Sequence, residues 1–248
     1  PSVYKSSLNF DGNNDTINLS NNSVFNLGTS FTISGWFNFS SNKYQGLISF
    51  DAASGGSPRG WFLFQIDTNN DIRLFDGTTV FTLKTSYTTT NQWDSFIITY
   101  DGTDLVFYIN GNQESTQAVS VDLQTNGNDA QIGNNQFASG RFFDGEISNI
   151  AFWNVGLTST QVTEVFNEGR PSDLHNFSGT APVAWWQLGS NSSYNSGAWT
   201  CLDEIGTNNA VSAGSMTNSD IVDGPGYSAS GLGTSSIDIV GDAPYSTA

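Results

Sequence analysis

Positively charged residues are scarce in this sequence, and their scarcity excludes several kinds of partner. The 248 residues include seven lysines and arginines against 23 aspartates and glutamates, so the formal net charge is −16. A surface with so few cations cannot neutralise a phosphate backbone, and its field repels anionic lipid headgroups. The sequence also lacks any apolar run near the ~20 residues of a membrane-spanning helix. We therefore expect no nucleic acid and no membrane among the partners of this chain.

Reactive and metal-binding side chains are equally few. His175, Cys201 and Met216 are each the only residue of their type. A single cysteine excludes an intramolecular disulfide and a Cys-based zinc site, and a single histidine excludes a His-rich metal centre. Serine-histidine-aspartate catalysis needs a positioned histidine, whereas His175 falls in a polar connector and is interpreted as an exposed loop residue. Cys201 is interpreted as a small, inert apolar residue.

Paired carboxylates, the usual machinery of glycoside hydrolysis, are also missing from the sequence. Such enzymes place two carboxyl groups on either side of the scissile bond. None of the glutamates has an aspartate two residues further on; they are Glu114, Glu146, Glu164, Glu168 and Glu204. The sequence therefore predicts that the protein is not an enzyme, and a glycoside hydrolase is the third-ranked hypothesis.

Turn residues between short β-branched and aromatic runs are what the chain has in abundance. Asp-Gly and Asn-Gly dipeptides, which tolerate the positive φ of tight turns, recur along the sequence. The predicted strands are residues 31–39, 47–50, 61–66, 72–75, 80–83, 96–100, 105–109, 147–153 and 183–188. Strands at this spacing are typical of sandwiches and jelly rolls. The predicted fold class is all-β, a two-sheet jelly-roll sandwich with one short helix and an extended C-terminal tail.

One helix is expected after Leu157. Thr158 is a good N-cap, and Gln161 stands three residues later, as a capping box requires. Gly169 is expected to take the left-handed C-terminal cap, and Pro171 prevents continuation.

The amino-acid composition of the chain changes after Leu188. Residues 189–248 are rich in Gly, Ser and Asn, with weak strands at best near 221–222 and 237–240. We divide the chain into a compact domain, 1–188, and an extension, 189–248, that either wraps the domain or connects it to something else. The low apolar content of the extension argues against its independent folding.

A set of motifs occurs in a defined order along the first two thirds of the chain. They are Ser7-Leu8-Asn9-Phe10-Asp11-Gly12, Phe31–Phe37, Gln92-Trp93 with Thr99-Tyr100-Asp101-Gly102 and Asn110-Gly111, and Ile132-Gly133-Asn134 with Phe143–Ile147. Over roughly residues 5–170 the sequence resembles the laminin-G-like branch of the concanavalin-A-like lectin/glucanase superfamily, as found in phage and bacterial surface proteins. The resemblance implies the jelly-roll fold, but that fold carries binders, adhesins and enzymes alike.

The resemblance also implies a Ca²⁺ ion at one rim of the sandwich. The family's ligands correspond here to Asn126, Gln124 and Asp76, while the family's remaining aspartate has no counterpart and Asp129 is a substitute. Carboxylate, amide and backbone oxygens suit Ca²⁺. The alternative is that Asn126-Gly127 forms only a hairpin turn.

Sugar binding would need an aromatic platform beside planar polar side chains. Trp36, Trp93 and Trp153 lie in regular runs and are expected in the core. The candidate ligand-binding residues lie in or beside loops, with packing as the alternative for each: Tyr44, Trp61, Phe137, Arg141 and Trp199.

Our leading hypothesis is a non-catalytic extracellular or virion-surface module that binds a glycan or another surface through its rim loops, with Ca²⁺ as the one candidate cofactor. The alternative is a phage structural or assembly protein, such as a decoration, fibre or tail subunit. In that case the sandwich and tail would pack against other virion or surface subunits. Homo-oligomerisation is left open by the sequence.

Overall fold

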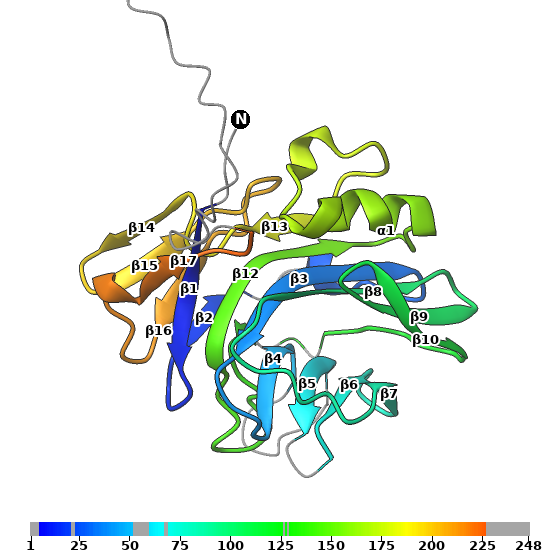
Figure 1. Ribbon diagram of the computed structural model, residues 1–248, viewed down its shortest axis with the longest axis horizontal. Coiled ribbons are helices and arrows are strands. Elements are labelled where there is room, and N and C mark those ends of the chain that lie inside the picture. The colour runs from blue at the N-terminus through cyan, green and yellow to red at the C-terminus, as the bar shows by residue number, and fades with distance from the viewer. Residues whose placement is uncertain are drawn as a thin grey trace, which may run out of the picture.

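The protein is a sandwich of two antiparallel sheets (Figure 1), which confirms the predicted fold class. The computed structural model describes residues 5–20, 23–51, 60–66, 69–125, 127 and 129–226. Within these residues one sheet has eight strands and the other has nine. No helix of this described part is long and apolar enough to cross a membrane.

Each sheet combines strands that lie far apart in the sequence. The eight-stranded sheet runs, in spatial order, β10 (Asn112–Ala118), β9 (Asp104–Ile109), β8 (Asp94–Tyr100), β3 (Phe31–Phe39), β12 (Asp144–Trp153), β1 (Ser6–Asp11) and β17 (Ile221–Asp223), with β13 (Ala184–Trp186) also paired to β12. The nine-stranded sheet runs β14 (Ser192–Asn195), β15 (Ala198–Cys201), β16 (Ala210–Ala213), β2 (Thr16–Leu19), β11 (Ala130–Ile132), β4 (Gln45–Ser49), β5 (Phe62–Ile66), β6 (Asp71–Phe75) and β7 (Val80–Lys84). The helical segments are α1 (Ser159–Phe166) and the 3-10 turns η1 (Ser23–Phe25), η3 (Asn167–Gly169), η4 (Leu174–Asn176) and η5 (Asn218–Asp220).

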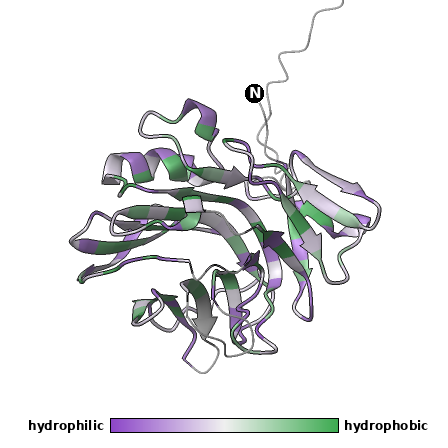
Figure 2. Cartoon of the chain, turned by 180° about the vertical axis from the view of Figure 1, so that it is seen from behind, coloured by the Kyte–Doolittle hydropathy of each residue, from purple (hydrophilic) through white to green (hydrophobic). Residues whose placement is uncertain are grey.

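Alternation along the strands creates the core between the sheets, and Figure 2 shows hydrophobic and polar residues interleaved along them. In β3, Phe31, Ile33 and Phe37 are buried in the main core. Gly35 faces the same side, where an added Cβ would lie 2.4 Å from Ile150 Cδ1. Because side chains alternate with a period of two, the intervening Trp36 lies on the outer side.

The helix α1 covers that outer side of the eight-stranded sheet (Figure 1). Its buried residues Val162 and Val165 belong to a second apolar cluster with Trp153 and Trp185. The predicted capping box of Thr158 and Gln161 is confirmed. The predicted C-cap was wrong: Asn167, at φ 47°, ends the helix in the left-handed region instead of Gly169. Asparagine tolerates this conformation because its short polar side chain can bond locally.

Residues 189–226 contain more β structure than their composition indicated. They form four strands that extend both sheets, with β16 paired to β2 and β17 paired to β1. Trp199, Cys201 and Met216 are part of the main core. Burial raises the pKa of the Cys201 thiol to about 11, as expected for the inert apolar residue that we predicted. Residues 237–240 lie outside the described residues, so that weak strand stays a prediction.

We expect a chain that ends at Leu188 to be much less stable than one that ends at Gly226. The truncation removes the strands that pair with β1 and β2 and takes Trp199 and Met216 out of the core. Each large apolar side chain that is buried contributes roughly 1.5–3 kcal/mol, so the loss should exceed ~3 kcal/mol. Urea unfolding of both chains measures this difference, and equal midpoints would contradict it.

Candidate ligand-binding site

Two loops meet beside the first residue of β4, and they bring two predicted ligand-binding residues into contact. The loop between β3 and β4 carries Tyr44, and the loop between β11 and β12 carries Arg141. The Arg141 guanidinium carbon lies 3.9 Å from the centroid of the Tyr44 ring, a cation–π contact. Phe137, in the same loop as Arg141, is half-buried. Among the described residues no carboxylate pairs with Arg141.

Main-chain hydrogen bonds hold the second loop against β4. The Arg141 carbonyl accepts from Gly46 N–H at 2.8 Å and from Asn135 N–H at 3.3 Å. Gly46 allows this approach because it has no side chain. An added Cβ would lie 2.2 Å from Asn135 N, which is closer than atoms can come without a shift.

Two buried asparagines in this loop have unused hydrogen-bonding atoms. Asn134 Nδ2 donates to Gln131 Oε1 at 2.8 Å, and Asn135 Oδ1 accepts from Phe137 N–H at 3.2 Å. Asn134 Oδ1 and Asn135 Nδ2 are buried without a partner within the described residues. Such a group costs roughly 1–3 kcal/mol when unsatisfied. One free acceptor and one free donor therefore lie in the loop that carries Arg141. We call Tyr44, Asn134, Asn135, Phe137 and Arg141 the loop site.

The set of ligand-binding residues predicted from the sequence missed both asparagines. The available signal was the run Gly133-Asn134-Asn135, directly after a strand, where polar side chains have no reason to be buried. It also missed the apolar support of Tyr44. Phe62 and Phe75 pair with ring centroids 4.8 Å apart on the outer side of the nine-stranded sheet, and Tyr44 packs against them.

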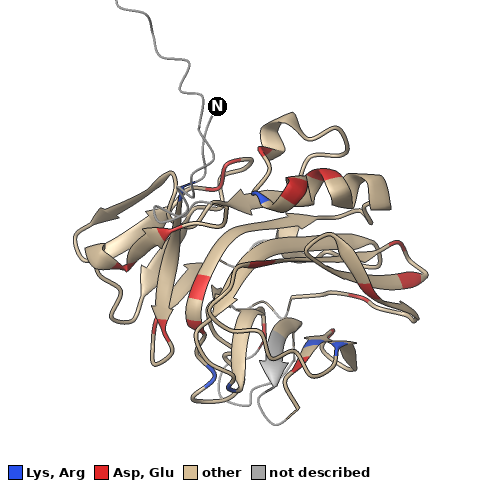
Figure 3. Cartoon of the chain, viewed as in Figure 1, with Lys and Arg blue, Asp and Glu red and all other residues tan. Residues whose placement is uncertain are grey.

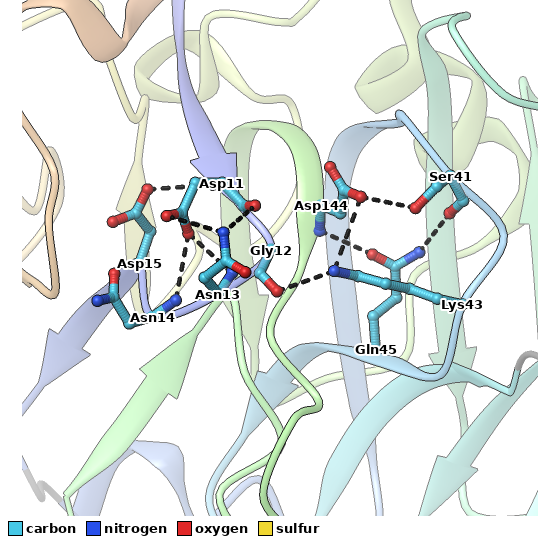
Figure 4. Close-up of polar contacts among 9 residues, drawn as sticks. All are labelled: Asp11, Gly12, Asn13, Asn14, Asp15, Ser41, Lys43, Gln45 and Asp144. Carbon is cyan, nitrogen blue, oxygen red and sulfur yellow. Dashed lines mark hydrogen bonds and ion pairs between the residues drawn. The ribbon is translucent and has the colours of Figure 1, made fainter.

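A polar network next to the loop site fixes the loop that carries Tyr44 (Figure 4). Lys43 Nζ donates to the Gly12 carbonyl at 2.9 Å and lies 3.6 Å from Asp144. Ser41 Oγ donates to the same Asp144 carboxylate at 2.6 Å, and Gln45 Oε1 accepts from Asp144 N–H at 2.8 Å. These bonds join the starts of β4 and β12.

The turn before β2 adds two carboxylates, Asp11 and Asp15 (Figure 4). Burial acts to raise the pKa of Asp11, but the N–H groups of Asn13 and Asn14 donate to its carboxylate and lower the pKa overall. Burial raises the pKa of Asp15, and the charge of Asp11 adds to this effect. Asp15 also accepts hydrogen bonds from Ser215, so both carboxylates serve the turn.

Trp61 and Trp199 are not at the surface, and their assignment as ligand-binding residues was wrong. Trp61 is 0% exposed and Trp199 is 3% exposed. Trp61 stands two residues before the core residue Leu63, and Trp199 two residues before Cys201, so alternation turns both rings inward. Their indole N–H groups donate to the carbonyls of Phe25 at 3.4 Å and Thr217 at 2.8 Å.

The predicted Ca²⁺ ligands do not form a cluster in the described residues. Asp76 Oδ1 caps its own hairpin by accepting from Thr78 and Thr79 N–H groups, and Gln124 Nε2 donates to Asp122. Asp129 precedes β11, three strand spacings or ~14 Å from β6, whose end Asp76 follows. No group of three His, Cys, Asp or Glu residues is placed to hold a metal in this part of the chain. Asn126 lies outside the described residues, so the calcium site stays a prediction.

The surroundings of His175 and Glu146 bear on the two kinds of catalysis considered from the sequence, serine-histidine-aspartate catalysis and glycoside hydrolysis. The ring nitrogens of His175 face the Asp173 carboxylate at 3.1 Å and the Glu204 carbonyl at 3.0 Å, so the ring is engaged on both sides. Burial raises the pKa of Glu146, and the charge of Asp223 adds to this, although Asn38 Nδ2 donates to Glu146 Oε2 at 2.9 Å.

The two-sheet antiparallel sandwich places the chain among jelly-roll domains. Residues 11–163 match the family model described as the concanavalin A-like lectin/glucanases superfamily, and the chain belongs to that superfamily. This confirms the resemblance found in the motifs. No curated protein sequence matches the chain.

Two solved structures show how widely the fold is shared. A Bacteroides ovatus protein, provisionally described as carbohydrate binding, superposes with a TM-score of 0.68 at 19% identity over 91% of this chain. The chain spans 62% of that protein's length. The heptameric SAP-like pentraxin of Limulus polyphemus superposes with a TM-score of 0.50 at 14% identity, over 74% of this chain and 93% of its own. At these identities the likeness is one of fold.

We expect Gly46→Ala to disturb the loop site. The new Cβ would collide with the main chain of Asn135, and forcing the loop away should cost about 1–3 kcal/mol. Urea unfolding measures the cost. Ser139→Ala, at an exposed position of the same loop, is the control and should change stability by less than ~0.5 kcal/mol. Equal stabilities of the two variants would contradict the close approach.

We expect Glu146→Gln to stabilise the protein at neutral pH. The raised pKa means that the charged carboxylate is unfavourable in the fold, and this penalty disappears as the pH falls through the folded pKa. Asn38 Oδ1 is buried without a partner among the described residues. The new amide could donate a hydrogen bond to it, and so could the protonated carboxyl group of Glu146. Melting temperatures should therefore differ at pH 7 and converge below the ordinary glutamate pKa of about 4.3. A variant that melts below the wild type at pH 7 would refute this account.

Proposed function

We propose that this protein is a non-catalytic carbohydrate-binding module that works outside the cell or on a surface, with the loop site as its ligand contact. The observation that carries the proposal is the pairing of Tyr44 and Arg141 where two loops meet. A sugar ring offers C–H faces to an aromatic side chain and hydroxyl groups that both donate and accept. The loop site supplies an aromatic ring and the guanidinium donors of Arg141, which complement these features.

Charge supports the same proposal. The chain carries a net charge of −16, and Figure 3 shows how few Lys and Arg residues stand among the Asp and Glu residues. Four of the seven cations nevertheless come from the loop before β4, the middle of β6, the end of β7 and the loop before β12: Lys43, Arg73, Lys84 and Arg141. Lys43, Arg73 and Lys84 each pair with a carboxylate. Arg141 keeps its donors for a ligand, and a guanidinium donates to both hydroxyl and carboxylate oxygens, more strongly to the carboxylate.

The alternative of a phage assembly protein drew on the idea that residues 189–248 lace neighbouring subunits together. Residues 189–226 instead extend both sheets of their own chain. The observations on the described residues therefore favour the carbohydrate-binding module. Location on a virion surface and binding of a Ca²⁺ ion remain parts of the hypothesis that experiment must test.

The test is a glycan array that includes neutral and acidic oligosaccharides, with and without Ca²⁺, followed by calorimetric titration of each hit. Tyr44→Ala should weaken binding at least tenfold, about 1.4 kcal/mol, because the stacking ring is lost. Tyr194→Ala, which changes a partly exposed tyrosine on β14, is the matched control and should leave the affinity unchanged.

Three outcomes would count against the proposal. The array could show no bound glycan, Tyr44→Ala could bind as tightly as the wild type, or the chain could cleave the bound glycan. The last result would favour the glycoside hydrolase, our third-ranked hypothesis. Loss of binding on removal of Ca²⁺ would instead support the predicted metal.

A further inference from the structure

A second opening lies at the same end of the sandwich, where β7 of one sheet meets β9 and β10 of the other. It is a groove of about 280 Å³, and its lining includes Lys84, Thr88, Gln92, Asp94, Asn110 and Glu114. The two sheets are joined beside it, since Ser115 Oγ donates to the Leu83 carbonyl at 2.7 Å and Gln117 Nε2 to the Thr82 carbonyl at 2.9 Å. Lys84, Asp94 and Glu114 therefore lie on strands at the joined edge, while Thr88 and Gln92 come from the loop between β7 and β8.

A buried carboxylate organises the base of the groove. Asp94 is 2% exposed and accepts hydrogen bonds from Gln92 Nε2 at 3.1 Å, from Asn110 Nδ2 at 2.5 Å and from the Tyr87 hydroxyl. Burial, with the Asp94 carboxylate beside it, raises the pKa of Tyr87, so the hydroxyl stays a donor. Asn110 Oδ1 accepts from Ser95 N–H at 2.9 Å. These bonds fix the amide planes of Gln92 and Asn110 before any ligand arrives.

The groove holds one ion pair and one buried carboxylate that neutral donors surround. Lys84 and Glu114 form an ion pair that joins β7 to β10, and both side chains are partly exposed. Three donors already surround Asp94, so a cation would gain little there. An anion would meet the charges of Asp94 and Glu114. Because an exposed ion pair contributes little stability, Lys84 and Glu114 can turn toward a ligand's hydroxyl groups at small cost.

The groups that remain for a ligand both donate and accept. Gln92 is exposed, and its Oε1 accepts no hydrogen bond from the described residues. Thr88 is exposed on the rim, and Ile109 forms an apolar wall. A cavity just under the ~300 Å³ of a small-molecule site accommodates one sugar residue of a longer chain. Neutral sugar residues, with many hydroxyl groups and an apolar face, match this lining.

We propose that this groove is a carbohydrate-binding subsite, separate from the loop site, that takes a residue of an uncharged oligosaccharide. The groove binds through Gln92, Thr88 and the Lys84–Glu114 pair, and its occupancy does not require Tyr44 or Arg141. The two sites are neighbours: Asn42 Nδ2, in the loop that carries Tyr44, donates to the Thr88 carbonyl at 3.4 Å. Across the sheet, β4 and β7 are three strand spacings apart, or ~14 Å.

The experiment follows the side-chain amide resonances of Gln92 and Asn110 in the ¹⁵N-labelled full chain. The probes are the neutral hexasaccharides of cellulose, starch, laminarin, xylan and mannan. We expect at least one of them to shift both resonances. Thr88→Trp should fill the groove and weaken this binding at least tenfold, and Gln92→Ala should weaken it about fivefold. Thr160→Trp, on the exposed start of α1, makes the same change away from the groove and should bind as the wild type does.

The results separate this proposal from that of the loop site. Arg141→Ala should leave the shifts of Gln92 and Asn110 in place. If no hexasaccharide moves these two resonances, or if the shifts persist in a folded Thr88→Trp variant, the groove is not a sugar subsite. Shifts confined to residues 134–141 would also overturn the groove proposal while supporting the loop site. If Thr88→Trp fails to fold, Gln92→Ala decides, and unchanged affinity in that variant overturns the proposal.

Discussion

Aromatic rings packed between the two sheets hold the sandwich together. Trp61 stacks on Phe50 at 4.5 Å, and Phe152 meets the edge of Trp61 at 5.9 Å and of Trp186 at 5.8 Å. Phe25 closes the cluster against Phe50 at 5.0 Å. A core packed this densely cannot release one ring without opening a cavity. The cluster lies where β4 ends and β5 begins, and the loop that carries Tyr44 lies at the opposite end of β4.

The strands could be predicted from the sequence because their side chains alternate with a period of two. The predicted strand Phe31–Phe39 matches β3 residue for residue. The same rule, applied one step further, would have placed Trp61 and Trp199 correctly, since each stands two residues from a core residue of its own strand. Proximity to a loop in the sequence is a poor guide to exposure when the residue still follows the alternation of the strand.

The loop site could be predicted only in part, because its geometry depends on contacts between distant segments. Tyr44, Phe137 and Arg141 could be named from their loop positions, but no local pattern indicates that Arg141 lies over Tyr44. That contact depends on the narrow space at Gly46 and on the bond from Gly46 N–H to the Arg141 carbonyl. The weak strand expected near 221–222 is confirmed as β17, but β14, β15 and β16 escaped detection for a related reason. In β15 and β16 only alternate residues are buried, and these include Cys201, Ala210 and Ser212, which carry a weak apolar signal.

The way the loop is held explains why its side chains can be assigned to a ligand. Arg141 anchors the loop to β4 through its carbonyl, a main-chain bond that any residue at position 141 could make, and Gln136 Nε2 adds a bond to the Ser49 carbonyl at 3.3 Å. These anchors do not use the guanidinium of Arg141. Asn134 and Asn135 each make one hydrogen bond in the loop, to Gln131 Oε1 and from Phe137 N–H, so their amides help to shape it. The Arg141 guanidinium, stacked on the Tyr44 ring, is the polar group of the loop that these contacts leave unused, and this is why the proposed function rests on that pair.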